Sequence, residues 1–180
     1  HGLVTEKDIQ TKSKVQTHKG KDFIVFPASF LDNMEKIKRG PQIMTPKDIG
    51  EIVIRTGISK DSKVLEIGAG SGALTSFMAR IAKQVVSYEI REDHAKIVEK
   101  NLKDLEITNV KLIKKDASEK IIEKNFDVAT IDVMEPWTVI NNVEKSLKKG
   151  GYIVSYSPSI PQIQSLIKEV NENKNLRVLK

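Results

Sequence analysis

Short apolar runs alternate with amphipathic stretches along the chain from about residue 45 onward. Five runs rich in β-branched residues predict strands, and apolar residues between them recur at helical spacing. The predicted strands are 63–67, 84–89, 110–114, 126–132 and 151–155, and the predicted helices are 72–82, 92–105, 117–124, 137–148 and 159–172. Because strands joined by crossover helices pair in parallel, the pattern predicts an α/β fold with a doubly wound, mainly parallel sheet. Residues 176–179 would begin a sixth strand.

The first forty residues follow a different pattern, being basic and polar with one apolar run at 23–26. That run predicts a short strand that Pro27 ends. Apolar residues then fall at helical spacing over 31–37, after Ser29 as a candidate helix cap. Residues 1–40 contain too few apolar positions to fold alone, so we expect a short β-containing appendage.

Residues 41–180 are predicted to form the main domain, which opens with a helix from Pro46 to about Gly57. A chain of 180 residues suffices for one domain of ordinary size. No apolar run approaches the roughly 18 residues that cross a bilayer. No leader segment is visible either, so we expect a cytoplasmic protein without a membrane partner.

The amino-acid composition limits which kinds of site and partner the chain can have. The chain has no cysteine and only three scattered histidines, which excludes disulfides, thiolate metal sites and a cysteine nucleophile and predicts no metal. Lysine and arginine number 30 against 24 acidic residues, a formal net charge of +6. This charge is compatible with a polyanionic partner such as nucleic acid.

The strongest chemical signal follows the first strand of the main domain. Glu66 precedes a G-x-G-x-G run at Gly68, Gly70 and Gly72. Glycines allow a sharp turn and leave no Cβ between the backbone and a ligand. Dinucleotide folds usually show G-x-G-x-x-G, so the tighter spacing predicts a pocket for a nucleoside. An ordinary tight turn between strand and helix is the alternative.

Three further carboxylates follow later strands. Glu89 ends the second strand about 20 residues beyond the glycines, where it can accept bonds from ribose hydroxyls; a solvated residue at a helix start is the alternative. Asp116 can accept a bond from an adenine amino group or cap a helix. Asp132 is a candidate general base that accepts a bond from an exocyclic amine, with a helix cap before Pro136 as the alternative.

These residues resemble the first motif and acidic strand edges of class I S-adenosylmethionine-dependent methyltransferases, which have a Rossmann-like fold. The runs 39–48 (R-G-P-Q-I-M-T-P-K-D) and 87–93 (S-Y-E-I-R-E-D) are more specific. With them the chain resembles archaeal-type tRNA adenine-N1 methyltransferases acting at positions 57 and 58. The resemblance implies methyl transfer from S-adenosylmethionine to N1 of an adenine in the tRNA T-loop. It also implies a homotetramer, with residues 1–40 as the remnant of a β-rich tRNA-binding segment.

The resemblance also implies site residues. Asp132 would be the catalytic aspartate. The implied cofactor contacts are Gln42, Ile43, Met44, Glu66, Gly68, Gly70, Ser71, Gly72, Ala73, Glu89, Asp116 and Ala117.

The chain departs from the family pattern in three places. Thr45 stands where the pattern has Tyr or His, which would stack on the target adenine. The family's D-L-P-x-P loop is present as 132–136 with Met134 in place of the first proline, which would stiffen the backbone. Most of the N-terminal domain and the closing C-terminal strand pair are not in the sequence, so we expect the C-terminal strands to be truncated.

Two other functions fit parts of this pattern. A methyltransferase acting on a small molecule, such as a corrin precursor, or on protein isoaspartate would have the same glycine loop and acidic strand edge. A non-catalytic subunit that binds tRNA without cofactor would account for Thr45. The intact loop with Glu66 and Glu89 argues against that second alternative, because a binding-only subunit gains nothing from them.

Overall fold

The structure is a computed structural model that describes residues 2–40 and 43–179. It divides into two compact units, His1–Lys36 and Ile37–Lys180. Among the described residues, no helix has the length and apolar character needed to cross a bilayer.

The smaller unit is a hairpin with two short helices. Its elements are α1 (Glu6–Thr11), β1 (Lys14–Gln16), β2 (Asp22–Ile24) and α2 (Phe30–Glu35). The strands pair antiparallel with Val15 opposite Phe23, so the strand predicted at 23–26 is shifted by one residue and shorter. The predicted cap is confirmed, because the Ser29 hydroxyl accepts from the backbone N–H of Asp32 in a capping box. Helix α1 was not predicted.

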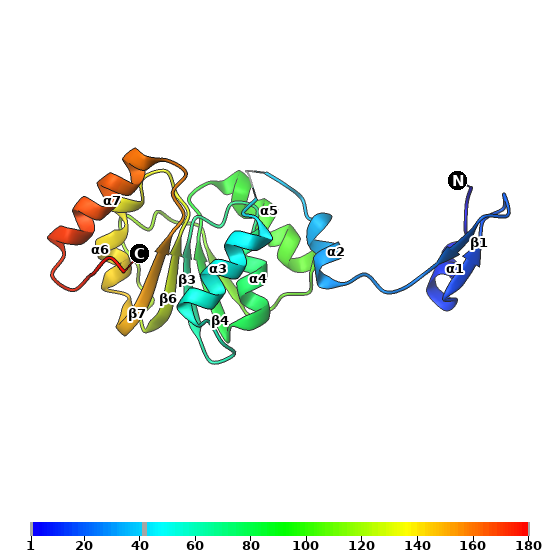
Figure 1. The fold of residues 1–180 in the computed structure, drawn as a ribbon, viewed down its shortest axis with the longest axis horizontal. Helices are drawn as coiled ribbons and strands as arrows, with labels where there is room; N and C mark the ends of the chain where they lie inside the picture. Colours follow the sequence, from blue (N-terminus) through cyan, green and yellow to red (C-terminus); the bar gives the residue numbers. More distant parts are fainter. Residues whose placement is uncertain (1, 41–42, 180) are drawn as a thin grey trace. The chain divides into compact units, whose positions relative to one another are not determined.

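The larger unit is built on one five-stranded parallel sheet. Its strands are β3 (Lys63–Ile67), β4 (Gln84–Tyr88), β5 (Val110–Ile113), β6 (Phe126–Ile131) and β7 (Leu147–Ser155). They lie in the order β5-β4-β3-β6-β7, so the chain starts at the centre, runs to one edge and returns to the other side of β3 (Figure 1). The doubly wound parallel α/β prediction is confirmed. The topology switches between β3 and β6, and ligands of such sheets bind at the carboxyl ends of the strands beside that switch.

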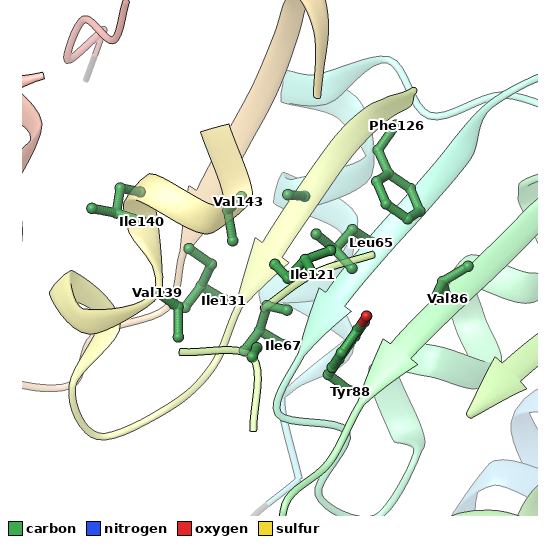
Figure 2. Packing of buried hydrophobic residues seen from close by; sticks show 12 residues of the cluster. Leu65, Ile67, Val86, Tyr88, Ile121, Phe126, Ile131, Val139, Ile140 and Val143 are labelled. Atoms are coloured by element: carbon green, nitrogen blue, oxygen red, sulfur yellow. The ribbon is translucent and has the colours of Figure 1, made fainter. Parts of the chain in front are cut away.

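Helices cover both faces of this sheet. They are α3 (Pro46–Thr56), α4 (Ala73–Ile81), α5 (Glu92–Asp104), the 3-10 helix η1 (Pro136–Thr138), α6 (Ile140–Glu144) and α7 (Ile160–Glu172). Val64 and Val85 pack with α3 and α4, whereas their chain neighbours Leu65 and Val86 pack on the opposite face with α6 and α7. This alternation follows from the two-residue period of a strand. Figure 2 shows the buried cluster on the face covered by α6 and α7, with Phe126 among its side chains.

The helix predicted at 117–124 is wrong. The segment turns at Ala117 and then has no regular secondary structure, with Ile121 buried and Ile122 exposed. A helix of eight residues has little stability of its own, so tertiary contacts decide its conformation. Here the Tyr88 hydroxyl donates to Glu123 at 2.7 Å, which holds the segment against the sheet.

Two C-terminal predictions also need correction. The helix predicted at 137–148 is limited to η1 and α6, and β7 begins at Leu147 rather than residue 151. The strand continues through a register shift in which Gly150 has a φ of +79°, a conformation that glycine favours. Residues 176–179 form no strand, because Leu176 packs against the core instead.

Candidate active site

The glycine loop lies between β3 and α4 at the carboxyl edge of the sheet. Gly68, Gly70 and Gly72 have φ values of +90°, +57° and +79°. A Cβ on Gly68 would lie 2.2 Å from the backbone oxygen of Asp132, and one on Gly72 would lie 3.3 Å from Val98. Glycine is therefore required at 68 both by its backbone conformation and by the loop that follows β6.

A cleft of about 330 Å³ opens where β3, β4 and β6 end. Four of the predicted cofactor residues line it: Gly68, Glu89, Asp116 and Ala117. Sequence reasoning missed its apolar walls, which include Ile90, Val133 and Val139. Ile90 could have been noticed, because it directly follows Glu89 at the strand end. An apolar cleft with a few convergent polar groups is the usual form of a small-molecule site.

A second hollow, of about 470 Å³, lies in the smaller unit and has a different character. Its walls are apolar side chains such as Ile9 and Phe26 together with Thr17, and none of the described residues that line it is ionisable. The chemistry of the described residues is therefore concentrated at the carboxyl edge of the sheet.

Glu89 is held in place by the backbone of two loops. Its carboxylate is 6% exposed, and one oxygen accepts from the N–H of Gly70 while the other accepts from the N–H of Arg91, each at 2.9 Å. His94 Nδ1 lies 3.9 Å from the first of these oxygens. Each carboxylate oxygen has a second lone pair, so Glu89 can still accept bonds from a ligand in the cleft.

Glu66 lies beneath the loop and does not line the cleft. Its side chain is 1% exposed, and Oε2 accepts from Thr75 and Ser87 hydroxyls at 2.5 Å each. Oε1 is buried and has no hydrogen-bond partner within the described part of the chain. Burial raises the pKa of Glu66 to about 7, against the lowering effect of the two hydroxyls, and the charges of Asp132 and Glu89 raise it further.

The segment that carries Asp116 is fixed by side chains from elsewhere in the unit. Asp116 Oδ1 accepts from the N–H of Ser118 at 2.8 Å, a local turn with no helix after it. Asn142 Nδ2 donates to the carbonyls of Ala117 and Ser118 at 3.0 and 2.7 Å. Burial, followed by the hydrogen bond to Glu123, raises the pKa of Tyr88 to about 12. Figure 2 shows the Tyr88 ring within the buried cluster.

Asp132 follows β6 directly, next to the residues that line the cleft. Its N–H donates to the carbonyl of Ile67 at 2.9 Å, which ties it to the end of β3. The side chain is open to solvent on one side and flanked by protein on the other, and this partial burial raises the pKa of the Asp132 carboxyl. A carboxylate with a raised pKa is a better proton acceptor.

Other predicted cofactor residues lie apart from the cleft. Ser71 and Ala73 are each 3% exposed, so their side chains face the protein. Met44 is buried in the core with Ile49, and Ile43 is half-buried. Gln42 lies outside the described residues. Gly70 and Gly72 belong to the loop but do not line the cleft.

Thr45 has a structural role of its own. Its hydroxyl accepts from the N–H of Asp48 at 3.3 Å and donates to the Asp48 carboxylate at 2.7 Å, which caps α3. The residue that stands where the family pattern has an aromatic ring is therefore the N-cap of a helix.

Sequence patterns did not identify Asn101 as a residue that supports the site. It is 1% exposed on α5, accepts from the N–H of Lys38, and donates to the carbonyls of Lys38 and Ser71, at 2.8 to 2.9 Å. It thereby joins the glycine loop to the segment that leads to Met44. A polar residue on a helix gives no signal of partners 30 and 63 positions away.

Comparison with known proteins identifies the family. Residues 27–179 match the family model of the tRNA methyltransferase complex GCD14 subunit. The chain belongs to this family. It is 34% identical to a Methanocaldococcus jannaschii protein named tRNA (adenine(57)-N(1)/adenine(58)-N(1))-methyltransferase TrmI, over 95% of this chain and 71% of that protein.

Solved structures agree with this membership. The tRNA (m1A58) methyltransferase TrmI of Aquifex aeolicus is similar at 30% identity with a TM-score of 0.77, over 84% of this chain and 62% of that one. An S-adenosylmethionine-dependent O-methyltransferase of Thermotoga maritima is similar at 32% identity with a TM-score of 0.80, over 88% and 61%. The chain thus spans about three fifths of these two proteins, and its fold is that of a class I methyltransferase.

Among the described residues, no group of three or more histidine, aspartate or glutamate side chains could hold a metal ion. The carboxylates of Glu89 and Asp116 at the cleft suit an organic cation with hydroxyl and amino groups. S-Adenosylmethionine, the methyl donor of this class of enzyme, has those groups.

Proposed function

We propose that this chain transfers the methyl group of S-adenosylmethionine to N1 of an adenine in the tRNA T-loop, at position 57 or 58. The single observation that carries the proposal is that Gly68, which lines the cleft, packs against the backbone of Asp132, so the candidate catalytic carboxylate lies directly before the loop residues 133–135 that line the same cleft. Membership of the tRNA methyltransferase family and the activity named for the Methanocaldococcus relative support the choice of substrate.

The residues at the cleft suit the parts of the cofactor. Glu89 would accept from the ribose hydroxyls, and Asp116 with Ala117 would contact the adenine. By family resemblance the glycine loop and residues 42–44 would hold the amino acid part, with the buried Glu66 supporting the loop from beneath. When bound, the cofactor supplies an electrophilic methyl group on a sulfonium centre.

Asp132 would act on the adenine rather than on the cofactor. Its carboxylate would accept a hydrogen bond from the exocyclic amine and help to remove a proton, which leaves the ring nitrogen richer in electrons. Its raised pKa suits that role. The Ile67 carbonyl and Gly68 hold the Asp132 backbone, so the carboxylate is oriented before substrate arrives.

The target adenine lies inside folded tRNA and must be extruded, at a cost of a few kcal/mol. Residues 1–40 are expected to be the remnant of a tRNA-binding segment, so their lysines and arginines would contact the tRNA phosphates. A homotetramer in the cytoplasm is part of the same proposal, by family resemblance.

The test is nucleoside analysis of tRNA transcripts after incubation with the protein and methyl-labelled S-adenosylmethionine. We expect labelled 1-methyladenosine from wild-type transcripts, and a loss of label when guanine replaces adenine at the modified position. Absence of label from every tRNA would contradict the proposal. Label in a hydroxyl group instead would favour the O-methyl transfer named for the Thermotoga protein.

A further inference from the structure

The loop after β6, residues 132–136, presents Asp132 and is tied to the protein at both ends. The N–H of Asp132 donates to Ile67, and Pro136 is buried at the start of η1. At the far end, the hydroxyl and the N–H of Thr138 both donate to the Glu135 carbonyl. Neither tie fixes the middle of the loop.

The middle of the loop is held from α7. Gln162 Nε2 donates to the carbonyl of Met134 at 2.8 Å, although Met134 itself is 83% exposed. The Ser159 hydroxyl donates to Gln162 Oε1 at 2.8 Å, which turns the amide so that its nitrogen faces the loop. Gln162 is half-buried and its bond from Ser159 is partly buried, whereas the bond to the Met134 carbonyl lies at an exposed position.

Helix α7 is a firm support for this contact. Leu166 and Val170 pack it against the core, and α7 also packs against η1. Towards its C-terminus Glu169 accepts from Asn141 of α6 at 2.7 Å, and Asn173 just after the helix donates to the same Asn141 at 2.8 Å. A hydrogen bond from such an element restrains a loop more than one from another loop.

We propose that Gln162 is a positioning residue for Asp132, and that its bond to the Met134 carbonyl restrains the backbone where the family pattern has a proline. A proline restrains the chain by fixing φ, whereas Gln162 restrains it from outside through one oriented amide. This inference rests on the proposed function, because Asp132 is the residue whose position matters.

The chain provides its own probe of this loop. Trp137 is its only tryptophan and lies in η1, next to the loop. In Gln162→Ala we expect acrylamide to quench Trp137 fluorescence more efficiently, with an unchanged melting temperature. We also expect kcat for tRNA methylation to fall roughly fivefold to tenfold, with a smaller change in KM for S-adenosylmethionine, as the loss of one orienting hydrogen bond implies.

Gln164→Ala is the matched control. Gln164 is an exposed residue of the same helix, and we expect its removal to change neither quenching nor kcat. Ser159→Ala frees the Gln162 amide without removing it, so it should shift both readouts in the same direction by less. If Gln162→Ala proves unstable, Ser159→Ala provides the test.

Rescue separates positioning from a general structural role. Met134→Pro in the Gln162→Ala background should return kcat to within about threefold of wild type, because it restores a backbone restraint. The proposal is overturned if Gln162→Ala leaves both quenching and kcat at wild-type values, or if quenching rises while kcat is unchanged. If the wild type methylates no tRNA, the proposed function fails, while Trp137 quenching still tests whether Gln162 holds the loop.

Discussion

Gly68 and Asp132 approach each other so closely that a Cβ on Gly68 would stand 2.2 Å from the Asp132 carbonyl oxygen. The N–H of Asp132 also donates to Ile67, the residue before Gly68, at 2.9 Å. The loop after β3 and the start of the loop after β6 therefore form one packed unit. The glycine loop and the candidate catalytic carboxylate are positioned by the same contact.

Substitution Gly68→Ala should damage this unit. The Cβ would collide with a backbone oxygen, and a φ of +90° strains any other residue, so we expect a loss of roughly 2 to 4 kcal/mol in the free energy of unfolding. Denaturant titration measures this loss. Calorimetry should also show weaker binding of S-adenosylmethionine.

Gly50→Ala is the control for that experiment. Gly50 lies in α3 with open space around the position that a Cβ would take and no unusual φ, so alanine should be neutral or stabilise by up to about 1 kcal/mol. A Gly68→Ala protein as stable as Gly50→Ala would contradict the close contact.

Glu66 should make stability fall as pH rises. Burial raises its pKa from 4.5 to about 7, so between these values the folded protein binds more protons than the unfolded chain. Stability therefore decreases through this range, by up to about 3 kcal/mol once both states are ionised. Glu66→Gln should remove the decrease, and urea titrations from about pH 4 to 8 measure the difference between the two proteins.

The exposed Glu119 provides the matched control for Glu66. Glu119→Gln should leave the pH profile parallel to that of wild type. A Glu66→Gln profile that is also parallel to wild type would mean that Glu66 is ionised without penalty in the folded protein.

Asn101→Leu should loosen the glycine loop. The substitution leaves the Ser71 carbonyl and the Lys38 backbone without their partner, and we expect a loss of about 2 to 4 kcal/mol in stability. Hydrogen exchange should accelerate in residues 37–40 and 70–73. The exposed Lys103 on the same helix is the comparison, since Lys103→Ala should change stability by less than about 0.5 kcal/mol. Unchanged exchange in both segments would show that Asn101 does not hold them.

Sequence patterns predicted those parts of the molecule that local chemistry determines. The strand Lys63–Ile67 has the predicted bounds, and α3 begins at Pro46 and ends one residue before Gly57, because apolar runs and glycine turns act over a few residues. The helix predicted at 117–124 was wrong, since Tyr88 and Asn142 hold this segment from distant parts of the chain.

The candidate site divides in the same way. Glu89, Asp116 and Asp132 could be predicted because parallel strands bring their carboxyl ends to one edge. The residues that hold the site in place could not be predicted from the sequence. Asn101 and Gln162 each lie within an amphipathic helix, and only the folded structure shows that they reach Ser71 and Met134.

Asp132→Asn tests the central claim most directly. The amide keeps the shape of the side chain but accepts no proton. Because Asp132 does not line the cleft, the substitution should leave cofactor binding intact. We predict that kcat for 1-methyladenosine formation in tRNA falls by about 10² to 10⁴, while the Kd for S-adenosylmethionine stays within about twofold of wild type. Undiminished methylation, or an equal loss of cofactor binding and activity, would contradict the account.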